Sequence, residues 1–446
     1  MKFTAFHLMS YPYLPDDFTQ KYRSVWVDIP RSLYDPKLGN RIYNDYLDQL
    51  ELADRLGFDG IGVNEHHQNA YGLMPSPNIM AAALARRTSQ ANLVVLGNSI
   101  ALYNPPVRVA EEFAMLDVIS GGRLVAGFPV GTAMDTNYCY GEVPATLREK
   151  YREAHDLILR AWTENDVFSF NGKYTKLRYV NLWPKPLQQP HPPIWIPGGG
   201  SVETWDFCAE HDYQYSFLSF FGYLAAKKVA DGYWETMAKR NKPLNPYSMA
   251  FAQGIVVAPT DQQAERDFAA HADYFYNRCL HIHPNFADAP GYRSLNSIRA
   301  AMKSGLPAQL KTHYSWKDLI DDGIIIAGSP QTVRQQVREA MKSLNCGHLI
   351  TGIHMGSMPP ELVRQSTELL AREVIPYLRD MWSEWEDKWS PRPLSASERA
   401  IPAPLSFPSG ADSPAVIDGG KSASTQAAAQ GMPASDPRAY EGRGPK

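Results

Sequence analysis

Short apolar runs alternate with amphipathic segments over most of this chain. The amphipathic segments repeat apolar residues at helical spacing, which predicts helices over 42–56, 77–88, 106–119, 146–163, after 201, and over 261–277 and 360–378. The apolar runs predict buried strands over 3–9, 59–63, 92–101, 123–128, 193–197, 213–218, 251–258 and 348–354. Eight strands that alternate with helices predict an α/β fold of the (β/α)8 TIM-barrel type.

Two long segments interrupt this alternation. One is Tyr11–Gly39, after the first strand, and the other is His281–Asp322, between the seventh helix and the eighth strand. Loops of this length inside a compact domain are usually lids or binding loops. The end of the chain, residues 386–446, is rich in Pro, Ala, Ser and Gly. This composition predicts a tail outside a barrel domain that covers residues 1–385.

Charge and composition exclude several classes of partner. The formal net charge of -3 at pH 7 provides no basic surface for nucleic acid or anionic membranes. No apolar run approaches the length of a membrane span, and the first residues are too polar for a signal peptide. The four cysteines show no CxxC pairing, so neither a disulfide framework nor a metal site is expected. Together these features predict a cytoplasmic enzyme.

A polar cluster ends the second predicted strand. Glu65, His66 and His67 directly follow the apolar residues 61–63. In parallel α/β folds, ligands bind at the C-terminal ends of the strands. Adjacent strand residues point to opposite faces, so only one of the two imidazoles can face a given cavity. We expect one imidazole to act there as a proton donor or acceptor. The alternative is a pair of hydrogen-bonded histidines in the barrel rim.

Three glycines, Gly198-Gly199-Gly200, separate the fifth strand from a helix that begins near Ser201 and Thr204. Backbone amides and hydroxyls at a helix N-terminus can bind an anion, although a plain helix cap in a flexible loop has the same composition. Arg148 begins the helix after the fourth strand, on the same barrel face, and can bind a phosphate with two N–H groups. We therefore predict a phosphate-bearing cofactor. Its expected contacts are Arg148, Gly199, Gly200, Ser201 and Thr204, with Asn98, Ser99 and Tyr138 as further candidates.

Several short strings in this chain resemble the bacterial luciferase-like family of flavin-dependent monooxygenases. The resemblance runs from Met1 to about Asp380, and the strings occur in the family's order. It implies a barrel that binds reduced FMN at its C-terminal face. The strings are Gly57-Phe58-Asp59, Glu65-His66-His67, Pro106-Val107-Arg108-Val109-Ala110-Glu111-Glu112, Leu116-Asp117, Ser120-Gly121-Gly122-Arg123, Ser201 with Thr204, and Ala327-Gly328-Ser329-Pro330-Gln331-Thr332-Val333.

The resemblance also implies roles for individual residues. It places His66 beside the flavin and assigns Arg148, Ser201 and Thr204 to the FMN phosphate. Luciferase α subunits carry Glu where this chain has Gly200 and Arg where it has Val130. The phosphate site is therefore expected to depend on backbone amides of the glycine run.

The implied reaction is an FMNH2-dependent monooxygenation. Reduced flavin and O2 would form a C4a-(hydro)peroxyflavin that transfers one oxygen atom to a small organic substrate, and a separate NAD(P)H:flavin reductase would supply FMNH2. Water must be excluded from such a reaction, so a lid is expected, and the segment 281–322 is the candidate. The expected substrate-facing or lid residues are His281, His283, Tyr292 and His313, with Tyr11, Tyr13 and Trp26 in the first insertion. The alternative is that these aromatic residues pack the loops onto the barrel.

Two other functions remain open from the sequence. One is hydride transfer by an F420-dependent oxidoreductase of the same fold. The other is a non-catalytic partner subunit like the luciferase β chain, which the presence of His66 argues against. No GxGxxG string follows a strand and opens a helix, so no nicotinamide site of the Rossmann type is expected. Because family members usually pair through helices beside the second and third strands, a homodimer or higher oligomer is expected.

Overall fold

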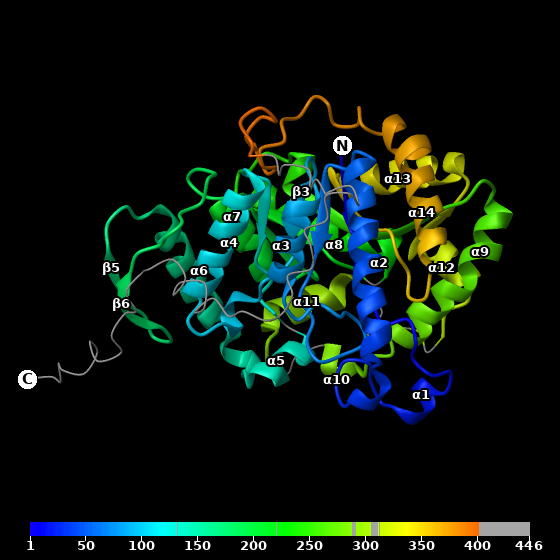
Figure 1. Cartoon of the computed structure of the whole chain (residues 1–446), viewed down its shortest axis with the longest axis horizontal. Coiled ribbons are helices and arrows are strands. Elements are labelled where there is room, and N and C mark those ends of the chain that lie inside the picture. Colours follow the sequence, from blue (N-terminus) through cyan, green and yellow to red (C-terminus); the bar gives the residue numbers. More distant parts are fainter. Residues whose placement is uncertain (132, 220, 288–290, 305–310, 312, 401–446) are drawn as a thin grey trace, which may run out of the picture. The chain divides into compact units, whose positions relative to one another are not determined.

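The computed structural model describes residues 1–400, except for 132, 220, 288–290, 305–310 and 312. Its central sheet closes into a barrel of parallel strands (Figure 1). The predicted (β/α)8 fold is therefore confirmed. In order around the barrel, the eight strands are β1 (Lys2–Phe6), β2 (Gly60–Val63), β3 (Asn92–Val95), β4 (Leu124–Gly127), β7 (Ile194–Gly198), β8 (Gln214–Phe217), β9 (Met249–Val257) and β11 (His348–Gly352), which pairs again with β1.

A further strand pairs with β9 outside this closed barrel. β10 (Ile325–Gly328) lies parallel to residues 254–257 of β9, whereas residues 249–254 pair with β8 and β11. After β10, Ser329 caps the helix α13 (Pro330–Leu344) by accepting a hydrogen bond from the amide of Thr332. Neither element was predicted from the sequence, because the strand that begins at residue 348 was expected directly after the insertion.

Helices surround the barrel (Figure 1). α2 begins at Pro36, six residues before the predicted start at 42, because the Asp35 carboxylate accepts hydrogen bonds from the amides of Lys37 and Leu38. As predicted, Gly121 ends α4, with a φ of 70°. The main helices are α2 (Pro36–Arg55), α3 (Pro77–Arg87), α4 (Val107–Ser120), α6 (Leu147–Thr163), α7 (Val202–His211), α8 (Gly222–Lys239), α9 (Asp261–Tyr274), α13, and α14 (Pro360–Leu369).

The two insertions contain short helices rather than long open loops. In Figure 1, α1, α5, α10 and α11 lie at the lower end of the barrel, opposite the N-terminus. None of the helices in the described part of the chain is long and apolar enough to cross a membrane. The short elements are α1 (Phe18–Lys21) in the first insertion, α5 (Met134–Tyr140) after β4, the hairpin β5 (Phe168–Asn171) and β6 (Lys176–Val180), and α10 (Pro284–Ala287), α11 (Leu295–Ser304) and α12 (Trp316–Asp321) in the second insertion.

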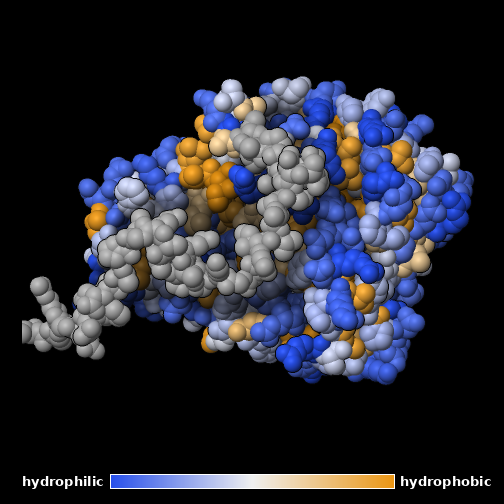
Figure 2. Space-filling view, viewed as in Figure 1, coloured by the Kyte–Doolittle hydropathy of each residue, from blue (hydrophilic) through white to orange (hydrophobic). Residues whose placement is uncertain are grey.

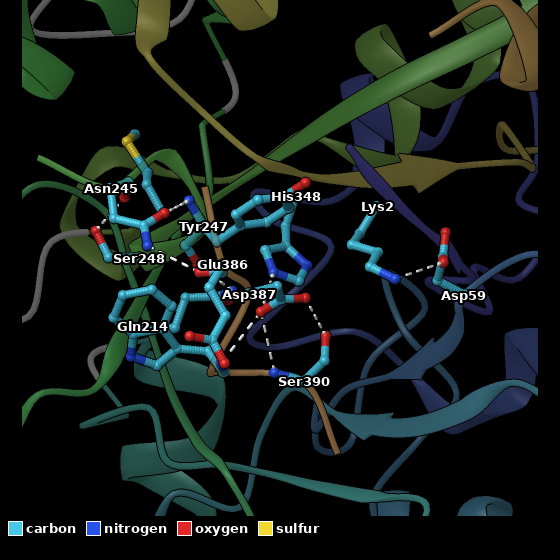
Figure 3. Close-up of polar contacts among 12 residues, drawn as sticks. Lys2, Asp59, Gln214, Asn245, Tyr247, Ser248, His348, Glu386, Asp387 and Ser390 are labelled. Carbon is cyan, nitrogen blue, oxygen red and sulfur yellow. Dashed lines mark hydrogen bonds and ion pairs between the residues drawn. The ribbon is translucent and has the colours of Figure 1, made fainter. Parts of the chain in front are cut away.

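The chain beyond α14 packs against the N-terminal ends of the barrel strands. The Asp387 carboxylate lies 3.4 Å from Nε2 of His348, the first residue of β11 (Figure 3). The indole of Trp195, inside the barrel, donates a 2.8 Å hydrogen bond to the carbonyl of Trp389. The described part of the predicted tail, residues 386–400, therefore contacts the barrel.

The barrel interior is filled at one end and hollow at the other. Leu96 and Ile350 belong to the filled layer and also line the cavity above it. The C-terminal ends of the strands are thus left open for a ligand. The buried residues of the filled layer are Val94, Leu96, Val125, Trp195, Ala250 and Ile350.

Candidate active site

A cavity of about 1630 Å³ lies at the C-terminal ends of the barrel strands. Its wall includes His66, three residues after β2, and the stretch Gly198–Ser201 between β7 and α7. The histidine and the glycine run, predicted from separate motifs, therefore line one cavity. Cavities of this size are large enough for a cofactor together with a small substrate.

His66 is held by a buried carboxylate. Its Nδ1 lies 2.9 Å from Oδ2 of Asp135 on α5, and the same oxygen accepts a 2.8 Å hydrogen bond from Nδ2 of the Asn69 side chain. Burial raises the pKa of Asp135, but the nearby His66 and hydrogen bonds to the carboxylate outweigh it and lower the pKa below its ordinary value. An ionised Asp135 holds the imidazole proton on Nδ1. Nε2 of His66 has no hydrogen-bond partner among the described residues.

His67 has a different partner from His66. Its Nε2 lies 2.9 Å from Oε1 of Glu65, which also accepts a 2.8 Å hydrogen bond from the hydroxyl of Tyr103. The second oxygen of Glu65 accepts the amide of Ser99 at 2.8 Å. Glu65 therefore ties the end of β2 to the segment that follows β3. His67 belongs to this framework, whereas His66 remains available to a ligand.

Aromatic side chains surround His66. Tyr71 meets the imidazole edge to face, with ring centroids 4.6 Å apart. Trp26, from the first insertion, is buried, and its ring centroid lies 5.9 Å from that of His66. Both aromatic residues line the cavity. They leave little room for water beside the histidine.

An anion cradle lies where α7 begins. The side chain of Ser201 does not cap the helix, so it does not satisfy the first amides. Instead, Ser201 Oγ accepts a 2.6 Å hydrogen bond from Nη2 of Arg148. Gly200 has a φ of 106°, and a Cβ on Gly199 would have no neighbour within 4 Å, so space remains beside these amides. Nε of Arg148 is buried and has no partner in the described structure. These donors fit a phosphate.

The carboxylate of Glu203 competes for the same donors. It accepts a 2.6 Å hydrogen bond from Ser201, and one oxygen lies 3.5 Å from Nη2 of Arg148. Ser294 and Ser297, from the second insertion, also donate their hydroxyls to it. Burial raises the pKa of Glu203, but these hydroxyls outweigh it and lower the pKa to about 2. A negative charge thus already lies in the cradle.

Glu203 was not identified from the sequence. A glutamate in the first turn of a helix ordinarily compensates the helix dipole, and that local pattern gave no further signal. Its serine partners lie more than ninety residues later in the chain, with sequence separations of 91 and 94. Only the folded arrangement brings α11 and its preceding turn onto α7.

The other predicted cofactor contacts have different positions. Ser99 and Thr204 line the cavity. Asn98 is fully buried and accepts a hydrogen bond from Asn78, so its amide belongs to the framework below the cavity. Tyr138 is 59% exposed on α5, outside the cavity wall, and its only ring neighbour among the described residues is Phe286.

The predicted substrate-facing residues also separate into two groups. Tyr11 is buried among the loops, where its hydroxyl accepts the amide of Asp35, and it does not line the cavity; Tyr13 packs against its ring. His283 lies outside the cavity wall as well. The positions of Tyr11, Tyr13 and His283 fit the alternative better, in which aromatic residues pack the loops onto the barrel. The four that do line the cavity are Trp26, His281, Tyr292 and His313.

Tyr292 connects the second insertion to the cradle. The guanidinium of Arg148 lies 4.4 Å from the centroid of the Tyr292 ring, a cation–π contact. The described residues contain no group of three or more His, Cys, Asp or Glu side chains placed to hold a metal ion. The cavity therefore offers a histidine–aspartate pair, an anion cradle and aromatic walls.

The sequence was then compared with known families. The family model of the luciferase-like monooxygenases matches residues 29–345. The chain belongs to this family. Limonene 1,2-monooxygenase of Rhodococcus erythropolis is 26% identical to this luciferase-like chain over 338 residues, which cover 74% of the chain and 80% of that enzyme. For two relatives of higher identity, 37% and 31%, the chain spans about half of their length, 46% and 48%.

Solved structures of the same fold include two that differ in cofactor. The oxygenating constituent of 3,6-diketocamphane monooxygenase from Pseudomonas putida, a type II Baeyer–Villiger monooxygenase in complex with FMN, matches with a TM-score of 0.65 and 20% identity, over 84% of this chain and 98% of that one. An F420-dependent secondary alcohol dehydrogenase matches with a TM-score of 0.58 and 18% identity, over 85% and 99%. At these identities the likeness establishes the fold. The predicted family is confirmed.

Proposed function

We propose that this luciferase-like protein is an FMNH2-dependent monooxygenase that inserts one oxygen atom from O2 into a small organic substrate. The main support is that the cavity with His66 in its wall also contains Gly199, Gly200 and Ser201, while Arg148, which donates to Ser201, lines a smaller cavity beside it. A flavin mononucleotide needs a phosphate site at one end and a proton-exchanging group near its ring at the other. Reduced flavin, when bound, supplies the electrons that activate O2.

The residues at the cradle would hold the cofactor's phosphate. Arg148 can donate through Nε and Nη2, while Ser201 and the amides of Gly199 and Gly200 provide short uncharged donors. For the phosphate to enter, the Glu203 carboxylate must leave Ser201 and Arg148. The serine hydroxyls of the second insertion can still satisfy it in a new position.

His66 would exchange a proton at Nε2. Because Asp135 accepts from Nδ1, the neutral ring presents a lone pair at Nε2, and the doubly protonated ring presents an N–H there. Trp26 and Tyr71 pack around the ring and limit the access of water to it. The second insertion would complete this exclusion, since His281, Tyr292 and His313 also line the cavity.

The proposal includes partners and location. A solved structural neighbour is described as an oxygenating constituent, which supports a separate NAD(P)H:flavin reductase as the source of FMNH2 for this chain. We also propose a homodimer in the cytoplasm. In Figure 2, hydrophobic surface is visible left of centre, in the region where Figure 1 shows α3 and α4. The exposed apolar residues of these helices are Ile79, Met115, Val118 and Ile119.

Hydride transfer with F420 is the second candidate. Its support is the fold shared with the F420-dependent secondary alcohol dehydrogenase. A non-catalytic role like that of the luciferase β chain is less consistent with a complete His66–Asp135 pair.

A binding and oxidation experiment separates the two candidates. Anaerobic titration with photoreduced FMN is expected to give saturable binding with one flavin per chain. Rapid mixing of that complex with oxygenated buffer is then expected to show a protein-dependent absorbance phase before oxidised FMN appears. Tight F420 binding, combined with FMNH2 oxidation at the rate of free flavin, would instead establish the second candidate.

A further inference from the structure

A second histidine lines the cavity, on a different strand from His66. His354 follows the last residue of β11 by two positions and is 8% exposed. β1 lies between β11 and β2 in the barrel. Since neighbouring strands are about 4.8 Å apart, the strands that carry His354 and His66 are separated by roughly 10 Å. One cavity thus has an imidazole on each side of β1.

His354 stacks on a buried histidine from β1. The ring centroids of His354 and His7 are 4.6 Å apart, with an interplanar angle of 26°. Nε2 of His7 lies 2.9 Å from the carbonyl oxygen of the Gln49 side chain, and Nδ1 accepts a 2.9 Å hydrogen bond from the amide of Met9. Both nitrogens of His7 are therefore occupied by the protein. Tyr46 packs on both rings, with centroids 4.1 Å from His7 and 5.0 Å from His354.

His354 itself is only half satisfied. One ring nitrogen faces the backbone carbonyl of Met358, which requires an N–H. Burial, and then the neighbouring His7, hold the pKa of His354 well below its ordinary value, so the ring is neutral. A neutral imidazole that uses its single N–H has a lone pair on the other nitrogen. Among the described residues, Met358 is the single hydrogen-bond partner of His354.

Among the described residues, the wall near His354 offers one hydroxyl donor, that of Tyr276, beside Gly254 and Met355. Phe6, Ile350 and Met355 line the cavity from the same two strands and the turn after β11. On the adjacent strand β9, Gln253 donates its side-chain N–H to the carbonyl of Ile324, and its buried Oε1 has no partner among the described residues. This side of the cavity thus contains unpaired acceptors in apolar surroundings.

We propose that His354 is a substrate-binding residue whose free ring nitrogen accepts a hydrogen bond from a hydroxyl or N–H group of the substrate. His7 is a positioning residue, which holds the His354 ring by stacking and does not contact the ligand. This inference rests on the proposed function, because it assigns a substrate class to the same cavity: small apolar molecules that carry one hydrogen-bond donor. A molecule with a methyl group at that position leaves the nitrogen unpaired.

Two probes of nearly equal shape test the assignment. p-Cresol and p-xylene differ only by a hydroxyl in place of a methyl group, and their dissociation constants can be measured on the full chain by calorimetry. The ratio of the two constants in wild type is compared with that in His354→Phe, which keeps an aromatic ring and removes both nitrogens. Wild type is expected to favour p-cresol on the order of tenfold more than the variant does.

Two further sets of variants check specificity. His191→Phe is the matched control, because His191 packs on Trp162, away from His354, and does not line the cavity. It should retain the wild-type ratio. His7→Phe should also retain the ratio, since it preserves the stacked ring, whereas His7→Ala should reduce it. If His7 were important only for stability, both variants would be less stable. The ratio of the p-cresol and p-xylene dissociation constants would then be the same in His7→Phe and His7→Ala.

Several outcomes would overturn the inference. They are equal ratios in wild type and His354→Phe, or failure of both probes to bind wild type. A crystal structure of wild type with p-cresol provides the same test without substitution, and the probe's oxygen is expected about 3 Å from the His354 nitrogen. FMN affinity, measured on the same proteins, is independent of these results. Intact FMN binding without a p-cresol preference refutes this inference alone, whereas a p-cresol preference without FMN binding refutes the cofactor assignment alone.

Discussion

His66 and Asp135 are separated by 69 residues in the sequence and joined by a 2.9 Å contact between Nδ1 and Oδ2. The carboxylate is fully buried, and the imidazole is 14% exposed on the cavity side. The aspartate therefore determines both the tautomer and the direction of the histidine. This resembles the way a buried carboxylate orients the histidine of a hydrolytic triad, where loss of the charge reverses the tautomer.

Substitution of this pair should reduce turnover without reducing flavin affinity. His66→Ala is expected to lower the rate of product formation by roughly 10²–10⁴-fold, the usual contribution of a positioned acid or base. Asp135→Asn should lower it too, because an amide can donate to Nδ1 and then leave the proton on Nε2. Steady-state turnover and FMN titration measure the two effects separately.

Glu142→Gln is the control for Asp135→Asn. Glu142 lies just beyond α5 and pairs with Lys150 rather than with a cavity residue. It should leave turnover unchanged. Full activity of His66→Ala would instead identify the chain as a non-catalytic subunit of the luciferase β type.

The cradle predicts that Arg148 discriminates FMN from riboflavin. Arg148→Gln removes a charged donor whose Nε has no other partner among the described residues. Hydrogen bonds to charged groups contribute about 1.5–3 kcal/mol, so FMN binding should weaken roughly 10–100-fold. Riboflavin has no phosphate, and its affinity should not change. Fluorescence titration with both flavins measures the difference.

Arg160→Gln tests whether the loss of any positive charge on α6 is enough to weaken FMN binding. Arg160 lies on the same helix but stacks on Phe168, in the hairpin. It should not alter the ratio of FMN to riboflavin affinity. If Arg148→Gln weakened both flavins equally, the phosphate would be bound elsewhere.

Removal of the Glu203 charge should strengthen FMN binding, whereas removal of the Arg148 charge should weaken it. Its pKa of about 2 keeps the carboxylate ionised at neutral pH, so it repels a phosphate and occupies the phosphate's donors. Glu203→Gln is expected to tighten FMN binding by roughly tenfold, or about 1.4 kcal/mol, and to leave riboflavin unaffected. Glu210→Gln, an exposed position near the end of α7, is the matched control. Weaker FMN binding in Glu203→Gln would mean that the carboxylate supports the site.

The sequence predicted the parts of this site that depend on one strand and its next turn. His66 and the glycine run follow short apolar strands directly, so the rule that ligands bind at the C-terminal strand ends placed them correctly on one cavity. Arg148 begins α6, the second helix after β4, and lines a smaller cavity beside the large one.

The missed residues depend on contacts between distant segments. Asp135, after β4, reaches His66, after β2, across the intervening strand β3. Glu203 contacts serines of the second insertion, which has no periodic sequence pattern. β10 was missed because four apolar residues beside a long insertion are too short to count as a strand on their own. Tyr138 was misplaced since an aromatic residue on a short helix can face either way.

The exposed apolar residues of α4 predict the surface used for self-association. Met115, Val118 and Ile119 are 49%, 46% and 47% exposed. Scattered apolar residues on a surface are normal, but three within five positions of one helix indicate an interface. The wild-type protein is expected to sediment as a dimer, and Met115→Asp with Ile119→Asp should give a monomer that still binds FMN. Leu224→Asp, which replaces a 53% exposed leucine on α8, should remain a dimer.

Buried histidines predict how stability depends on pH. Burial lowers the pKa of His7 and of His155 from 6.5 to about 4. Between these pH values the unfolded chain binds more protons than the folded one, so the free energy of unfolding falls as the pH drops from 6.5 to 4. Each group can contribute up to about 3 kcal/mol to this loss.

Urea unfolding of wild type and His155→Gln across pH 4–8 tests this prediction. Loss of the Tyr213 hydrogen bond should make the variant less stable than wild type above pH 7. Below pH 6.5, the free energy of unfolding of the variant should nevertheless decline less steeply than that of wild type, and the slopes should differ by up to one bound proton. Above pH 7 the two curves should run parallel. Parallel curves over the whole range would mean that His155 takes up its proton without unfolding. The stability loss between pH 6.5 and 4 would then have to come from another buried histidine with a lowered pKa, such as His7.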